Sequence, residues 1–238
     1  MAIVRQELML FDQPAFQTAV EKGFWIDVHP TNTITAQGPI EFSVNGGIDY
    51  IDIANTVLYI KSRICKADGS AYAENAEVAF VNNAMHSMFS DIFLTLGNEV
   101  IEGGDCTYPY KAMLSTLFSF SEQAMQTQLA AVGFVKDQNS KMDEKENSGF
   151  VKRKAWTTQG SKEFMGKLFL DMCQQIQYLP NNTDVRIKLI RSKNEFCICH
   201  HVVGEKPKLV IEDAILYVHK CRINPKILLE HEMALEKK

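Results

Sequence analysis

Two cysteines and two histidines cluster near the C-terminus, at Cys197, Cys199, His200 and His201. Thiolate and imidazole are the usual ligands of zinc, but a zinc site normally draws on two well-spaced pairs of ligands. The other cysteines and histidines of the chain offer no second pair at such a spacing. If the segment EFCICHHVV is a strand, Cys197 and Cys199 share one face, as small buried thiols of a sheet core do. The pattern therefore predicts no metal site and no cofactor.

Enzyme motifs give no better candidate. A cupin metalloenzyme needs two histidines one residue apart on a strand, whereas His200 and His201 are adjacent and would face opposite ways. The motifs G-x-S-x-G, G-x-x-x-x-G-K-[ST], H-E-x-x-H and G-x-G-x-x-G are missing from the chain. The sequence thus predicts no catalytic residues and no enzymatic activity.

Basic residues gather in two places that could contact phosphate. One is the run KRK at residues 152–154, and the other is a strand face with Arg186 and Lys188, followed by Arg191 and Lys193. The formal net charge is -4 and the pI is about 5.9, which is not typical of a nucleic-acid binder. We therefore interpret both as solvated faces and predict no sequence-specific binding of nucleic acid.

The segment VNNAMHSMFSDIFLTLGNEVI, residues 81–101, combines a histidine with several amides. Its first half is too short for a confident helix and fits a loop or a single helical turn, while residues 92–96 alternate like a strand before a hairpin turn at Gly97-Asn98. We interpret His86 as a buried packing residue. Asn82 and Asn83 are expected to hydrogen-bond to backbone in a loop.

The composition is that of an ordinary globular protein. The 238 residues are 46% hydrophobic and 23% charged, which fits one large all-β or α/β domain or two small ones. No apolar run reaches the roughly 18 residues of a membrane span, and Arg5, Glu7 and Asp12 interrupt the N-terminal segment where a signal peptide would be apolar. We expect a soluble, intracellular chain without a membrane partner, whose six cysteines are free and buried.

Strand patterns dominate the chain on both sides of one helical stretch. Alternating or β-branched runs occur in GPIEFSV, IDYIDIANTVLYIKSRI, DIFLTL, TDVRIKLIRS, EFCICHHVV and KLVIEDAILYVHKCRI, and strand signals also occur in KEFMGKLFLDMCQQIQYL. The roughly eight strands predict an all-β jelly-roll sandwich of two antiparallel sheets, because strands that are buried on one face must pack against a second sheet. No βαβ repeat supports a parallel fold.

The remaining segments define the expected domain organisation. Residues 1–30 lack a sustained period and predict an irregular N-terminal arm, and residues 31–238 form a single jelly-roll domain. Within that domain, a helical insertion is expected at about 110–135 because apolar residues recur there at helical spacing. A mobile loop is expected at about 136–150, where apolar residues are almost missing.

Seven segments, read in order, resemble one protein family. They are LFDQP, GPIEFSV, YIDIANTVLYI, VNNAMHSMFSDIFLTLGNEVI with TYPYKAMLSTLFSF, DVRIKLIRSKNEFC, and IEDAILYVHKCRINPKILLEHEMALE. Their order and spacing resemble the major capsid proteins of Polinton (Maverick) elements and the related adintoviruses, over almost the whole chain. The resemblance implies a structural protein with two jelly rolls, of which this chain would match the N-terminal one. It implies self-association into trimeric or pseudo-hexameric capsomers of an icosahedral virion.

The chain ends about where the family's linker to its second jelly roll begins. A truncated gene product, an expressed domain and a host-retained piece with a new role all remain open, as do a hexamer of single rolls and pairing with a separate second-roll chain or a penton protein. A β-sandwich that binds a ligand or a host surface is the alternative from another functional class. The resemblance implies that the mature location is the virion.

Overall fold

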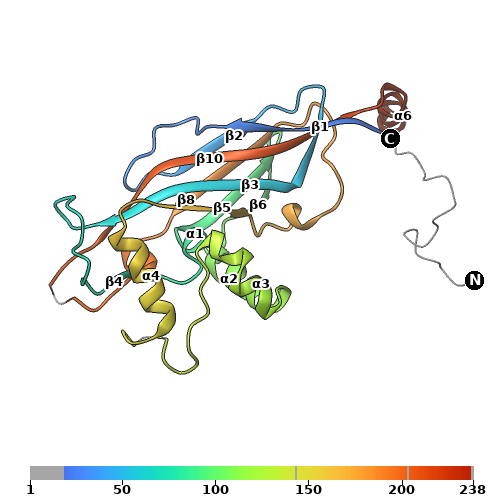
Figure 1. Cartoon of the computed structure of the whole chain (residues 1–238). Coiled ribbons are helices and arrows are strands. Elements are labelled where there is room, and N and C mark those ends of the chain that lie inside the picture. The colour runs from blue at the N-terminus through green and yellow to red at the C-terminus, as the bar shows by residue number, and fades with distance from the viewer. Residues whose placement is uncertain (1–18, 143, 203, 237–238) are drawn as a thin grey trace, which may run out of the picture.

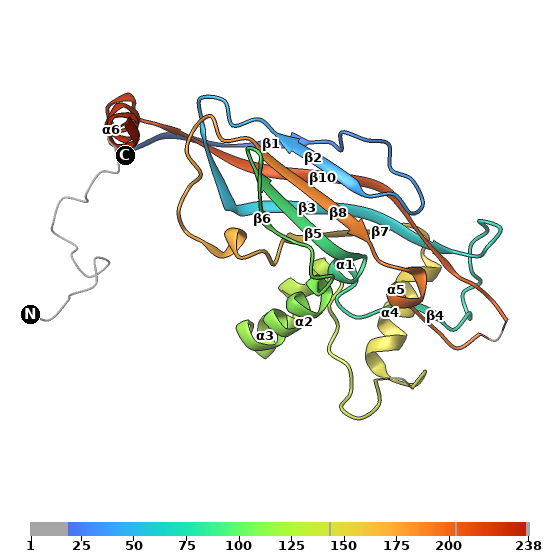
Figure 2. The same cartoon turned by 180° about the vertical axis from the view of Figure 1, so that it is seen from behind.

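The computed structural model describes residues 19–142, 144–202 and 204–236, and its main body is two four-stranded antiparallel sheets packed face to face (Figures 1 and 2). The first sheet has the order β1-β10-β3-β7. Its strands are β1 (Val20–Val28), β10 (Lys208–Ile223), β3 (Tyr50–Cys65) and β7 (Lys162–Lys167).

The second sheet has the order β2-β8-β5-β6. Its strands are β2 (Ile40–Val44), β8 (Val185–Arg191), β5 (Phe89–Leu96) and β6 (Glu99–Glu102). A small third sheet pairs β4 (Val78–Phe80) with β9 (Ile198–His200). The predicted hairpin turn at Gly97-Asn98 connects β5 to β6, and Gly97 has the positive φ of 59° that a tight turn requires.

The path of the chain through the two large sheets is that of a jelly roll. The first strand, β1, pairs with the last, β10, and the next one inward from each end, β2 and β8, pair in the other sheet. Of these eight strands, only β5 and β6 are successive strands paired as a hairpin. This nested, first-with-last pairing confirms the predicted all-β jelly-roll sandwich.

The core lies between the two sheets and follows the period of two in each strand. On β8, Val185, Ile187 and Leu189 are at most 2% exposed, while the two cations between them face outward. Phe42 from β2 and Phe164 from β7 are both 1% exposed. Burial of each such side chain stabilises the fold by about 1.5–3 kcal/mol.

The expectation of an irregular arm over residues 1–30 is wrong for residues 20–28, which form β1. This strand has eight register pairs with β10, although Gly23 and a bulge near Val20 weaken its alternation in the sequence. Phe24 and Ile26 are only partly buried because β1 is the edge strand of its sheet. Residues 1–18 lie outside the described residues.

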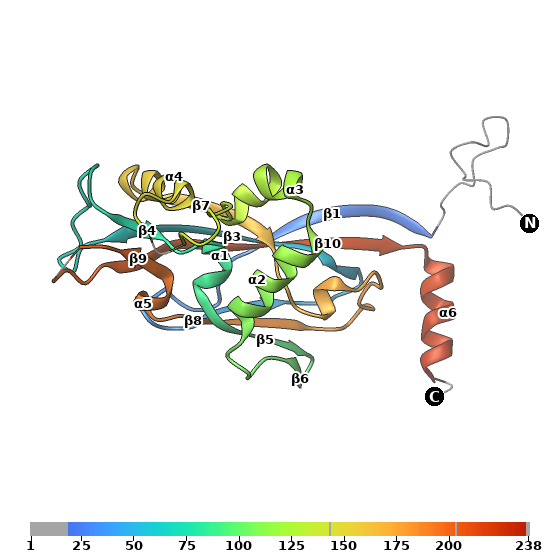
Figure 3. The same ribbon diagram turned by 90° about the horizontal axis from the view of Figure 1, so that it is seen from below.

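Helices gather along one side of the sandwich (Figures 1 and 3). They are α1 (Ala84–Ser87), α2 (Tyr108–Ser119), α3 (Glu122–Gln126), the short 3₁₀ helix η2 (Gln128–Val132) and α4 (Ser148–Thr158). Two shorter segments are the 3₁₀ helix η3 (Met172–Gln174) and α5 (Asn194–Cys197). The last helix, α6 (Pro225–Glu236), lies beyond the end of strand β10 (Figure 3). No sequence pattern predicted α4. The mobility expected at about 136–150 stays a prediction. None of the helices in the described parts of the chain has the length and apolar content that crossing a membrane would require.

Candidate interaction surfaces

The cysteine and histidine cluster is dispersed by the fold. Cys197 is the last residue of α5, so the strand expected for EFCICHHVV begins only at Ile198, and that prediction is wrong for residues 195–197. The Cys197 thiol donates to the carbonyl of Ser87 at 3.4 Å, and the His201 ring packs edge-on against Phe150 with centroids 5.2 Å apart. Among the described residues, no group of three or more histidine, cysteine or acidic side chains is arranged to hold a metal ion.

None of the six cysteines, all of which lie in the described residues, forms a disulfide in this structure, and four of them are buried. Burial raises the pKa of Cys173 and of Cys197 to about 12, so both stay protonated thiols near neutral pH. Cys106 is exposed and Cys199 is half-buried, so the expectation that every cysteine is buried is wrong for these two. The buried thiols are packing groups of low reactivity.

The basic run at residues 152–154 is not a continuous cationic surface. Arg153 is buried on α4, where its Nη1 lies 2.9 Å from Asp137 Oδ1 and its Nε donates to the carbonyl of Phe80 at 3.0 Å. Lys154 donates to the carbonyl of Asn75 at 3.2 Å. The central cation of the run is therefore a structural group that joins α4 to β4.

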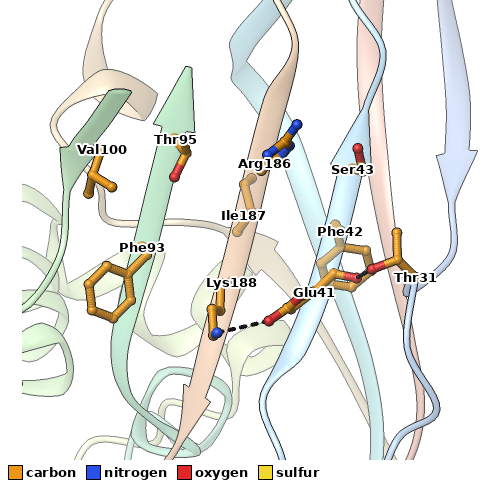
Figure 4. A pocket seen from close by; sticks show the side chains of 10 residues that line it. All are labelled: Thr31, Glu41, Phe42, Ser43, Phe93, Thr95, Val100, Arg186, Ile187 and Lys188. Carbon is orange, nitrogen blue, oxygen red and sulfur yellow. Dashed lines mark hydrogen bonds and ion pairs between the residues drawn. The ribbon is translucent and has the colours of Figure 1, made fainter. Parts of the chain in front are cut away.

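The outer face of the second sheet carries the other basic group. Arg186 and Lys188 point away from the core on β8, as the alternation predicts, and Lys188 Nζ lies 2.9 Å from Glu41 Oε1 on β2 (Figure 4). Arg191 does not belong to this face, which corrects its grouping with the others. It is half-buried at the end of β8, Nε and Nη1 have no partner among the described residues, and burial lowers its pKa.

A shallow cavity of about 580 Å³ lies on this same outer face. The register of the strands places the side chains in rows across the sheet (Figure 4). In one row Lys188 lies between Glu41 and Phe93, and in another Arg186 lies beside Thr95. The surface combines an aromatic ring with charged groups of both signs. It could receive a polar partner but holds no nucleophile with a neighbouring base among its lining residues.

The outer face of the first sheet is more apolar. Ile215, Tyr59 and Met165 form one row across β10, β3 and β7, and Met165 is 43% exposed. Trp25 of β1 is 53% exposed and lies against His219, with ring centroids 5.0 Å apart. Exposed tryptophan and methionine side chains on one sheet face are typical of a face that contacts another protein.

Helix α2 turns its larger apolar side chains outward. After the buried Tyr108 and Pro109 of its first turn, its buried residues are the small Ala112 and Thr116. Leu114, Leu117 and Phe118 are 52%, 45% and 83% exposed. Tyr110 is 59% exposed and lies edge-on to Phe196 at 5.8 Å. We name the set Tyr110, Leu114, Leu117 and Phe118 the apolar face of α2. The sequence predicted the helix but not which face would be buried.

His86 is buried, as expected of a packing residue, on the single helical turn α1. Asn82 behaves as predicted, because its amide donates to the carbonyl of Val135 at 2.7 Å and accepts from the Val135 N–H at 2.9 Å. The prediction is wrong for Asn83, whose side-chain oxygen and nitrogen are buried without a partner among the described residues. Asn83 instead has a left-handed backbone with φ 55°.

No protein-family model matches the chain, and no curated protein matches it. Among solved structures, the chain is similar to a chain in the cryo-EM structure of the Sputnik virophage, with a TM-score of 0.63 and 11% sequence identity. The match covers 94% of this chain and 53% of the Sputnik chain. The chain is also similar to the PBCV-1 virus capsid, with a TM-score of 0.57 and 10% identity over 92% of this chain and 46% of that one. The third is the Faustovirus major capsid protein, with a TM-score of 0.56 and 8% identity over 94% of this chain and 58% of that one.

The chain spans about half the length of these three chains. Identities of 8–11% show a common fold rather than a family. The likeness covers nearly the whole chain, which includes both large sheets, and agrees with the jelly-roll topology.

Proposed function

We propose that this domain is a structural capsid protein that self-associates into capsomers of a viral or virus-derived icosahedral shell. The observation that carries the proposal is the combination of the nested jelly-roll topology with the exposed apolar face of α2. Solved chains that share this fold include ones named as a virus capsid and a major capsid protein. The motif order further supports a major capsid protein of the Polinton or adintovirus type, with this chain as its first jelly roll.

The partner in this proposal is another jelly roll. The chain covers about half of each similar capsid chain, so a second roll would supply the other half, either from a second copy or from a separate segment. A penton protein is a further proposed neighbour in the shell, and the virion is the proposed location. The role needs no catalytic residue, cofactor or metal.

Side chains on α2 are the proposed anchors of the contact. Phe118 is 83% exposed, and its ring would be removed from water when a neighbour covers the helix. Contiguous apolar surface of this kind on a soluble domain is typical of an interaction site. Replacement by a charge would leave that charge buried in the interface.

The test is light scattering and electron microscopy across protein concentration and salt, with and without a co-expressed second-roll chain. We expect trimers, hexamers or particles, and we expect Phe118→Glu to weaken their formation by about thirtyfold, since an interface anchor contributes about 2 kcal/mol or more. Ile176→Glu is the matched control, because Ile176 is 89% exposed and lies outside this face. A wild-type chain that stays monomeric under all conditions would refute the proposed function, whereas equal assembly of both variants would refute only the role of α2.

The outer-face cavity of about 580 Å³ favours a second candidate function, a β-sandwich module that binds a ligand or a host surface. This function predicts a strictly monomeric protein with selective affinity on a glycan or ligand array. Arg186→Ala, which alters this face alone, would then reduce binding, whereas in the capsid function the array would be blank.

A further inference from the structure

A second cavity, of about 420 Å³, lies between α2, η2, β7 and the segment that follows β7. Its wall is largely apolar and includes Leu129, Val132, Met165 and Phe169, and His86 contributes to the same wall. Small-molecule sites are typically concave, mostly apolar and about 300–1,000 Å³, with a few polar groups that set orientation. This cavity has that size and composition.

The hydrogen bonds around His86 leave one of its ring nitrogens unused. Nδ1 lies 2.8 Å from the Tyr108 hydroxyl oxygen, which also accepts the Phe169 backbone N–H at 3.5 Å. The Tyr108 hydroxyl proton has no other acceptor among the described residues, so we assign it as the donor to Nδ1. The ring proton of a neutral His86 then sits on Nε2. Nε2 is buried and has no partner among the described residues.

Both groups are uncharged near neutral pH. Burial lowers the pKa of His86 to about 3, and burial raises the pKa of Tyr108. The unused group is therefore a neutral N–H donor rather than a cation. Lys167, the cation among the lining residues, already donates to Asn55 Oδ1 at 2.8 Å. The neutral donor of His86 suits a neutral oxygen acceptor better than an anion, whose desolvation it would not compensate.

We propose that this cavity is a binding site for a small, uncharged and largely apolar molecule with one acceptor oxygen, which takes the hydrogen bond from His86 Nε2. A single water could accept the same hydrogen bond, but it occupies about 30 Å³ and would leave most of the apolar wall without contacts. A ligand with an aromatic or alkyl body fills the cavity, and its carbonyl or ether oxygen satisfies the buried donor. The proposal is independent of whether the chain forms a shell.

Acetophenone and α-methylstyrene test the proposal, because they have the same shape and differ by an oxygen in place of a methylene group. Their dissociation constants are measured by NMR titration on the wild-type protein, on His86→Phe and on the control His200→Phe, whose histidine is exposed and outside the cavity. The hydration free energy of each free compound is the same for all three proteins. It therefore cancels when the ratio of the two dissociation constants is compared between proteins. We expect that ratio to shift about fivefold against acetophenone in His86→Phe and to stay unchanged in His200→Phe. Continued binding of α-methylstyrene by His86→Phe shows that the cavity is intact.

The wild-type protein gives a second readout that does not depend on a variant folding. Nitrogen-15 shifts of the imidazole should show the proton on Nε2, and acetophenone should shift that nitrogen. Three results would overturn the proposal: failure of both compounds to bind at millimolar concentration, the same affinity ratio in all three proteins, or a ring proton on Nδ1.

Discussion

Arg153→Met tests whether the buried ion pair with Asp137 holds α4 on the sandwich. The side chains of Arg153 and Asp137 are only 4% and 10% exposed, and their atoms Nη1 and Oδ1 are 2.9 Å apart. Asp137 Oδ2 also accepts from the Asn82 amide at 2.9 Å. Arg153 Nε donates to the carbonyl of Phe80. The substitution keeps most of the side-chain volume but leaves the carboxylate without its cation.

The expected cost is the cost of an unpaired buried charge. Removal of one partner from a buried ion pair destabilises proteins by about 3–5 kcal/mol. A domain of this size has a free energy of unfolding of about 5–15 kcal/mol, so the variant should lose a large fraction of its stability. When Asp137→Leu is added, the charge is gone as well, and part of the loss should be recovered, with a coupling of about 2 kcal/mol.

Urea unfolding followed by circular dichroism measures these free energies. Lys152→Met is the matched control, because Lys152 is the exposed neighbour in the same basic run and its replacement should change stability by less than about 0.5 kcal/mol. A loss below about 1 kcal/mol for Arg153→Met, or a double variant that loses the sum of the two single effects, would refute a stabilising pair at this position.

Three further predictions rest on other parts of the structure. In thermal unfolding, Gly133→Ala should destabilise the fold by more than about 2 kcal/mol, because the φ of Gly133 is 81° and the new Cβ would lie 2.7 Å from packed side chains. The control Gly160→Ala should cost only about 1 kcal/mol, because Gly160 has a similar φ of 92° but open space around it. Burial lowers the pKa of His86 to about 3 from an unfolded value near 6.5, so the stability contributed by the neutral imidazole is complete above pH 6.5 and falls as the pH drops. In urea titrations from pH 7 to 4.5, the wild type should lose about 3 kcal/mol more of its unfolding free energy than His86→Phe. Parallel curves of stability against pH for the two proteins would contradict the assignment. At pH 8, Cys173 and Cys197 should resist a thiol reagent until the chain unfolds, since their pKa is about 12, and mass spectrometry that finds them labelled in the native state would disprove this.

Much of the second sheet could be predicted from local sequence. The alternation of Val185, Ile187 and Leu189 with Arg186 and Lys188 determines which side chains are buried, because successive residues of a strand face opposite ways. The same rule located β3 and β10, and Gly97 marked the hairpin between β5 and β6. These features depend on neighbours within a few residues, so the pattern is present in the sequence alone.

The first strand and the fifth helix were missed for a common reason. Residues 20–28 and 194–197 have weak or misleading patterns, and distant segments decide their conformation. Val20 is opposite Ile223, about two hundred residues later in the chain. Contacts over such separations leave no local period to read.

The candidate sites show the same division. A run of three cations in the sequence became a buried ion pair plus two separate lysines, because Asp137 reaches the middle residue from another segment. Spacing predicted a helix at Leu114 and Leu117, but beyond its first turn the helix buries the small Ala112 and Thr116 and leaves these leucines outside. The cavity beside His86 has no sequence signal, since its walls come from four segments.

The sequence by itself determined the β class, the inward and outward faces of the regular strands, the free thiols and the burial of His86, because hydrophobic period and residue chemistry are local properties. Only the tertiary structure decided that β1 closes the first sheet against β10, that Arg153 is buried and that α2 presents its apolar face to solvent. These outcomes depend on which segments, distant in sequence, pack against one another. No single segment therefore carries the information that decides them.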